Sequence, residues 1–65
     1  MVKLIYQKFD GTDELVEVEY HTFEKAMFEA YCLHTSKTGQ PVKIIDESGK
    51  VYGAVEILNY LRSKY

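Results

Sequence analysis

In this chain of 65 residues, the side chains that could bind a soft metal ion or act as a thiol nucleophile are Cys32, His34 and His21. Cys32 and His34 are two residues apart, so on a helix they lie about 200° apart around the axis. Side chains on opposite faces of one helix cannot share a zinc ion. We therefore expect no metal ion and no cofactor, and we expect Cys32 to be an ordinary surface thiol.

Two segments have compositions that resemble ligand-binding loops, and turn chemistry explains both. Residues 35–39 are rich in hydroxyl groups, but they follow a predicted helix C-terminus, where exposed carbonyl groups repel anions. Residues 46–49 lack the alternating oxygen ligands of a calcium loop and are of the types that a tight turn favours. No pairing of a nucleophile with a base is visible, so we assign no catalytic residue. The alternative is a small enzyme or ligand-binding subunit whose site is assembled only in the fold.

Acidic residues are concentrated in one short segment, whereas the basic residues are scattered. Five of the ten acids lie in residues 10–19: Asp10, Asp13, Glu14, Glu17 and Glu19. Charges on an edge strand discourage aggregation between sheet edges. Alternatively, Asp13, Glu14, Glu17 and Glu19 form an acidic docking surface for a basic partner. Direct nucleic-acid binding is disfavoured, because neutralising phosphates requires a clustered basic face and the net charge is −2.

The apolar pattern predicts an α+β fold in the order ββαββα, with a four-stranded, mainly antiparallel sheet of two hairpins packed against two helices. In the first hairpin, apolar residues alternate with polar ones on both sides of residues 9–11. A three-residue loop there, with Gly11 in the left-handed conformation, would pair Leu4 with Val16 and Val2 with Val18.

The remaining elements follow from capping and turn signals. Thr22 is a candidate N-cap for the first helix, and Gly39 and Pro41 are expected to end it. The second hairpin would run from Val42 to Asp46, turn over residues 47–49 and return at residues 51–52. The final stretch is expected to be helical, with an apolar stripe of Ile57, Leu58, Leu61 and Tyr65.

The two faces of the predicted sheet differ in how well the chain can cover them. One face can pack against helices and carries Val2, Leu4, Tyr6, Val16, Val18, Val42, Ile44 and Tyr52. The other carries Lys3, Ile5, Gln7, Leu15, Glu17, Lys43, Ile45 and Val51, which is more aliphatic than a solvated face needs to be. A second chain or a partner would cover it unless the C-terminal helix crosses to that side. The expected interface residues are Ile5, Leu15, Ile45 and Val51, with Phe28 and Tyr31 on the outward side of the first helix.

From Thr22 onward, the order of a helix, the strand 41–46, the turn and strand 49–53 and a second helix resembles half of a CBS module. The resemblance covers about two thirds of the chain. Members of that family that bind adenosyl ligands carry Thr or Ser and then Asp shortly after the last glycine. The matching stretch here offers Glu56 and Asn59, so we do not expect nucleotide binding.

Length and composition indicate a single domain over residues 1–65. One cysteine allows no intramolecular disulfide, which favours a reducing, cytoplasmic compartment. No apolar run approaches the ~18 residues that span a membrane. We expect a small non-enzymatic protein–protein interaction module that forms a homodimer or serves as an accessory or inhibitory subunit. A second hypothesis is a phage-type or mobile-element regulator that binds a nucleic-acid-binding protein through the acidic surface.

Overall fold

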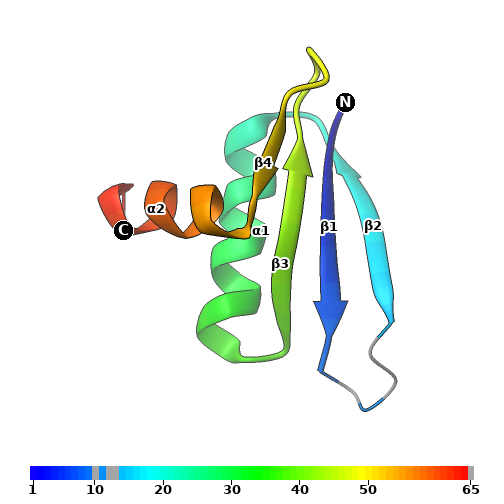
Figure 1. Ribbon diagram of the computed structural model, residues 1–65, viewed down its shortest axis with the longest axis vertical. Coiled ribbons are helices and arrows are strands. Elements are labelled where there is room, and N and C mark those ends of the chain that lie inside the picture. The colour runs from blue at the N-terminus through cyan, green and yellow to red at the C-terminus, as the bar shows by residue number, and fades with distance from the viewer. Residues whose placement is uncertain (10, 12–13, 65) are drawn as a thin grey trace.

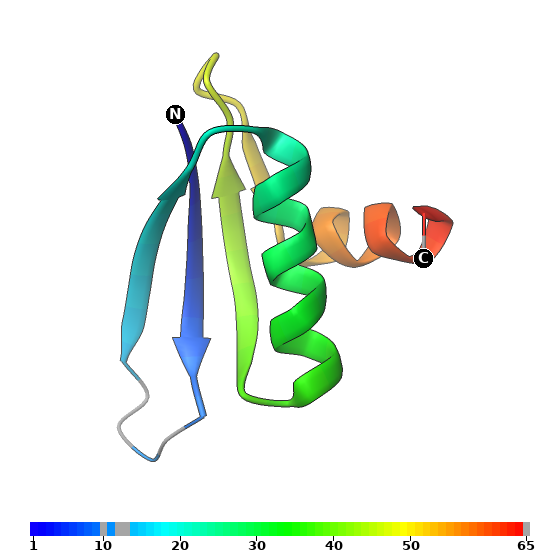
Figure 2. The same cartoon turned by 180° about the vertical axis from the view of Figure 1, so that it is seen from behind.

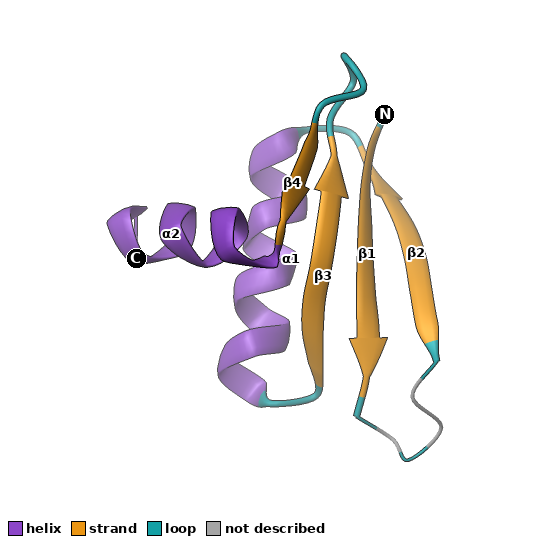
Figure 3. Cartoon of the chain, viewed as in Figure 1, coloured by secondary structure: helices purple, strands orange, loops and turns teal. Residues whose placement is uncertain are grey.

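The computed structural model describes residues 1–9, 11 and 14–64, and within them it has the predicted α+β order ββαββα (Figure 1, Figure 3). The elements are β1 (Val2–Lys8), β2 (Leu15–Tyr20), α1 (Phe23–Ser36), β3 (Gly39–Ile45), β4 (Val51–Gly53) and α2 (Ala54–Lys64). The strands form one antiparallel sheet in the order β2-β1-β3-β4. None of the helices in the described chain is long and apolar enough to cross a membrane.

Both helices lie on the same side of the sheet. Helix α1 packs along β1 and β3, and α2 begins directly after β4, where it contacts β3, β4 and α1. Figure 1 shows α1 behind the sheet and α2 running away from the β4 edge, and Figure 2 shows the same arrangement from behind. The C-terminal helix therefore does not cross to the second face, and the described helices leave that face uncovered.

The core lies between the sheet and the helices. Its buried members are Val2, Leu4, Ala26, Met27, Ala30, Ile44, Ile57 and Leu61. Phe23 closes one end of it, with its ring centroid 4.9 Å from that of Tyr52 and 5.5 Å from that of Tyr60. Each fully buried aliphatic side chain stabilises the fold by about 1.5–3 kcal/mol, so this cluster holds the two helices to the sheet.

The register of the first hairpin differs from the predicted one by two residues. Leu4 pairs with Val18 rather than Val16, and Val2 pairs with Tyr20 rather than Val18. The Lys8 amide donates to the Glu14 carbonyl at 3.0 Å, so the connection is longer than the predicted three residues. A shift by two keeps every side chain on its face, so the apolar pattern cannot distinguish the two registers. Gly11 does have a positive φ of 94°.

The first helix begins where its capping residue predicts and ends earlier than expected. The Thr22 side chain accepts a hydrogen bond from the Lys25 amide at 3.1 Å, which confirms the N-cap. At the other end, Lys37 takes the left-handed conformation with φ 58°, and Gly39 is already the first residue of β3. Glycine is needed there for space, because a Cβ atom on Gly39 would lie 2.9 Å from the Gln7 carbonyl oxygen.

Pro41 lies within the interior strand β3, and the strand continues past it. The β1–β3 register shifts between Ile5 and Tyr6, so that Tyr6 pairs with Pro41 and Gln7 with Gln40. The short strand β4 pairs only with residues 43–45, so the missing N–H of Pro41 removes no hydrogen bond to β4. Because of this register shift, Gln40 lies beside Gln7 of β1.

The turn between β3 and β4 is organised by Asp46, as the sequence predicts for residues 47–49. Its carboxylate accepts hydrogen bonds from the Ser48 hydroxyl at 2.6 Å, the Ser48 amide at 2.9 Å and the Lys50 amide at 3.0 Å. The bond from the Ser48 hydroxyl is the main reason that the pKa of Asp46 lies below its usual value. Gly49 completes the turn with φ 91°.

Two glycine-to-alanine substitutions distinguish the cost of a steric contact from the general effect of adding a methyl group to the backbone. We expect Gly39→Ala to lower the free energy of unfolding by about 1–3 kcal/mol, because the added methyl group meets the Gln7 backbone. Gly53→Ala is the matched control, since a Cβ atom there has nothing within 4 Å and its φ is not positive. Thermal unfolding followed by circular dichroism measures both. Equal Tm values for the two variants would contradict the packing at Gly39.

Candidate interaction surface

The uncovered side of the sheet, which we call the open face, is built from the alternate residues of all four strands that point away from the core. Three cross-strand rows define it. Val51, Ile45, Lys3 and Glu19 form the first row, Lys43, Ile5 and Glu17 the second, and Gln40, Gln7 and Leu15 the third.

Aliphatic side chains cross the open face as a diagonal. Val51 on β4 lies directly opposite Ile45 on β3. Ile5 on β1 is the diagonal neighbour of Ile45, and Leu15 on β2 is the diagonal neighbour of Ile5. Diagonal neighbours in a sheet are about 7–8 Å apart, within reach of long side chains. The four predicted interface residues of the sheet are therefore brought together, and we call them the apolar stripe.

The members of the apolar stripe differ in how much water they meet. Leu15 is 64% exposed and Val51 is 51% exposed, whereas Ile5 is 9% exposed and Ile45 is half-buried. Ile5 sits on β1 between Glu17 of β2 and Lys43 of β3. The two ends of the stripe are thus the parts that a partner could still cover.

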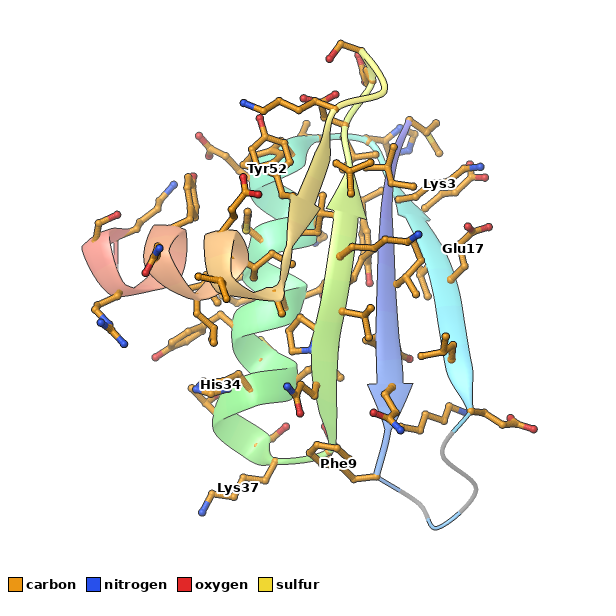
Figure 4. All side chains as sticks on the ribbon, viewed as in Figure 1. Lys3, Phe9, Glu17, His34, Lys37 and Tyr52 are labelled. Atoms are coloured by element: carbon orange, nitrogen blue, oxygen red, sulfur yellow. The ribbon has the colours of Figure 1, made fainter. Side chains whose placement is uncertain are left out.

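Charged side chains of both signs flank the stripe. Lys3 lies opposite Glu19, and not opposite Glu17 as the sequence-based register implied, while Lys43 lies opposite Ile5. Figure 4 shows Lys3 and Glu17 extending from neighbouring strands. Among the described residues these charges make no ion pair with one another, since the pairs formed are Met1 with Glu47 and Lys64 with Glu24. The open face therefore presents charges of both signs beside the apolar stripe.

The predicted acidic docking surface is only partly on the open face. Glu17 and Glu19 alternate along the edge strand β2 and point to this side. Glu14 is exposed just before β2. Asp13 lies outside the described residues. The face as a whole carries two lysines beside these glutamates, so it is mixed in charge rather than acidic.

The two aromatic residues expected on the outward side of the first helix have different surroundings. Phe28 is 45% exposed, as expected. Tyr31, however, packs against the core beside Leu58, Leu61 and Arg62 of α2, so the prediction that it faces outward is wrong. The reason is that α2 covers this flank of α1, an approach also marked by the contact between Glu24 and Lys64 at 3.8 Å.

Cys32 is half-buried rather than open to solvent, which corrects the expectation of an ordinary surface thiol. Phe28 and Ser36 occupy the neighbouring positions four residues away on the helix, where side chains reach one another. The described residues contain no group of three or more side chains that could hold a metal ion.

A shallow hollow under α2 was not foreseen from the sequence. It has a volume of about 260 Å³ and is lined by Phe9, His34, Gly39, Gln40, Pro41, Ala54 and Leu58. In Figure 4, His34 lies on α1 and Phe9 lies just after the end of β1. The lining residues come from distant parts of the chain, and only the tertiary packing brings them together. Among the described residues of the lining, the imidazole of His34 is the one titratable side chain, so they offer no acid–base pair.

Comparison of this chain with models of known protein families, with curated proteins and with solved structures found no match. The functional argument therefore depends on the surface itself.

Alanine substitutions in the apolar stripe should distinguish its buried central residue from an exposed residue at its end. We expect Ile5→Ala to reduce the free energy of unfolding by about 2 kcal/mol or more, because the side chain is almost fully covered. Leu15→Ala should change it by no more than about 0.5 kcal/mol, since most of the side chain is in water. Urea unfolding at low protein concentration gives both values. A larger loss for Leu15→Ala than for Ile5→Ala would show that the stripe is packed differently.

Proposed function

We propose that this protein is a small, non-enzymatic protein–protein interaction module that binds through the open face of its sheet. The observation that carries the proposal is the apolar stripe, which crosses all four strands on a face that no described helix covers. Exposed aliphatic side chains bordered by charged residues on an uncovered sheet face favour an interaction site.

The exposed ends of the stripe supply an energetic reason for association. Covering an aliphatic side chain fully gains about 1.5–3 kcal/mol, so covering the exposed parts of Leu15 and Val51 would gain about 1 kcal/mol each. The core of so short a chain stabilises it by only about 3–5 kcal/mol. A bound partner would therefore add appreciably to the stability of the fold.

A second candidate function uses the edge of the sheet instead of its face. Glu17 and Glu19 lie on the edge strand β2, which leaves backbone groups available to a basic, extended partner segment. Lys3 and Lys43 on the same face weaken the attraction for such a partner. The apolar stripe therefore favours a partner that covers the whole face.

Sedimentation equilibrium over a concentration series tests the leading proposal. We expect the wild type to increase in mass with concentration, and we expect Leu15→Lys and Ile45→Lys to reduce that increase while keeping the circular dichroism spectrum. Leu15→Lys is the safer variant for folding, because Leu15 is 64% exposed. Phe28→Lys is the matched control, since Phe28 is a large exposed residue on α1, away from the open face.

Each outcome of these measurements supports or contradicts binding through the open face. Loss of self-association in Phe28→Lys, with none in Leu15→Lys, would move the interface to α1. Unfolding of Ile45→Lys alone would show that Ile45 is required for folding, and Leu15→Lys would then decide the proposal. A wild type that stays monomeric at millimolar concentration would contradict self-association through this face.

A further inference from the structure

We propose that a groove between α1 and α2 binds a small free carboxylate with an apolar body, an alkyl or aryl carboxylic acid. Two neighbouring hollows form this groove, and they share His34 of α1 and Leu58 of α2. Their volumes are about 260 Å³ and 320 Å³, near the lower end of the ~300–1,000 Å³ range of small-molecule sites. The groove contains no member of the apolar stripe, so the inference does not depend on the proposed function.

The groove exists because β4 is much shorter than β3. Strand β4 pairs only with residues 43–45, so no described strand lies beside residues 39–42 at that edge of β3. Helix α2 begins directly after Gly53, and Figure 1 shows it leaving the sheet at a steep angle to α1. The first hollow lies in the corner beneath α2, between Pro41 of β3, Ala54 of α2 and His34 of α1.

The hollow beneath α2 is mainly apolar. Phe9, Pro41, Ala54 and Leu58 line it, and Phe9 is 54% exposed. The Phe9 amide donates to the Thr38 carbonyl at 3.2 Å, which ties the backbone of Phe9 to the start of β3. Covering exposed apolar surface is favourable, so this hollow suits the apolar body of a ligand.

The second hollow supplies a positive charge. Arg62 lines it together with Tyr31 and Leu61, and Arg62 forms no ion pair with another described residue. The described residues that line the two hollows include no carboxylate. A guanidinium group has N–H donors and no acceptor, and its forked geometry matches a carboxylate. The group bound at this end of the groove should therefore be an anion.

The order of the hollows gives the ligand a direction. Its carboxylate would lie beside Arg62, and its apolar body would extend past His34 and Leu58 towards Pro41. Figure 4 shows His34 on α1, below α2 in that view. The net charge of the protein is −2, so the chain as a whole does not attract anions. A preference for a carboxylate would have to come from the groove itself.

An NMR titration with octanoate, octan-1-ol and octylammonium tests the inference, because the three probes share an octyl chain and differ in the charge of the head group. We expect millimolar dissociation constants for so small a ligand in an open groove. Octanoate should bind about fivefold more tightly than octan-1-ol at low ionic strength, and octylammonium more weakly than both. The amide shifts should centre on His34, Leu58 and Arg62.

Three variants assign the two ends of the ligand. Arg62→Gln should weaken octanoate binding about fivefold, to the level of octan-1-ol, because it removes the charge and keeps a long side chain. Lys64→Gln is the matched control, since it makes the same charge change in the last turn of α2 at a residue outside both linings. It should change the affinity for octanoate less than about twofold. Phe9→Ser should weaken octanoate and octan-1-ol equally. Circular dichroism confirms that each variant folds.

The contradicting results are distinct. Equal affinities for octanoate and octan-1-ol would overturn the selection of a carboxylate. An equal effect of Arg62→Gln and Lys64→Gln would overturn the role of Arg62. Shifts centred on the open face would overturn the groove as the site and would leave the proposed function standing. A peptide of alternating glutamate and leucine that shifts the groove amides at about tenfold lower concentration than octanoate would replace the free carboxylate with an acidic protein segment.

Discussion

A four-stranded sheet has two faces, and this chain places both of its helices on one of them. Leu4, Met27, Ile44 and Ile57 are fully buried in the core between that face and the helices. On the other face, Ile5 is only 9% exposed, whereas Leu15 and Val51 are more than half exposed. Neither described helix packs on the open face, which we propose to be the site that a partner covers.

The charged residues of the open face are of both signs, and they differ in their distance from the sheet edge. Glu17 and Glu19 on the edge strand oppose edge-to-edge pairing of two sheets, because such pairing would bring the glutamates together. Lys3 and Lys43, closer to the centre, give the same face regions of opposite sign. Face-to-face contact can use that difference, whereas edge contact cannot. In the proposed function, the charge pattern would restrict the way in which a partner approaches, and the aliphatic residues would supply the attraction.

The sequence predicts some features of this structure and not others, for physical reasons. The two-residue period of a strand assigns Ile5, Leu15, Ile45 and Val51 to one face, and the structure brings them together there. The same period cannot detect a register shift of two residues, so the predicted register of the first hairpin was wrong. Lys3 therefore lies opposite Glu19. Helical periodicity alone could not place Tyr31, because α2 packs against a flank that the sheet does not reach. The hollow beside His34 depends on residues from four elements and connections, and no local pattern signals it.

We propose that the chain's own helices cover one face of the sheet and that association covers the other. Amide chemical shifts recorded by NMR over a dilution series test it most directly, residue by residue. We expect concentration-dependent shifts centred on Ile5, Ile45 and Leu15, with the amides of α1 around Phe28 unchanged. Shifts confined to α1 and α2, or a spectrum that does not change between micromolar and millimolar protein, would contradict it.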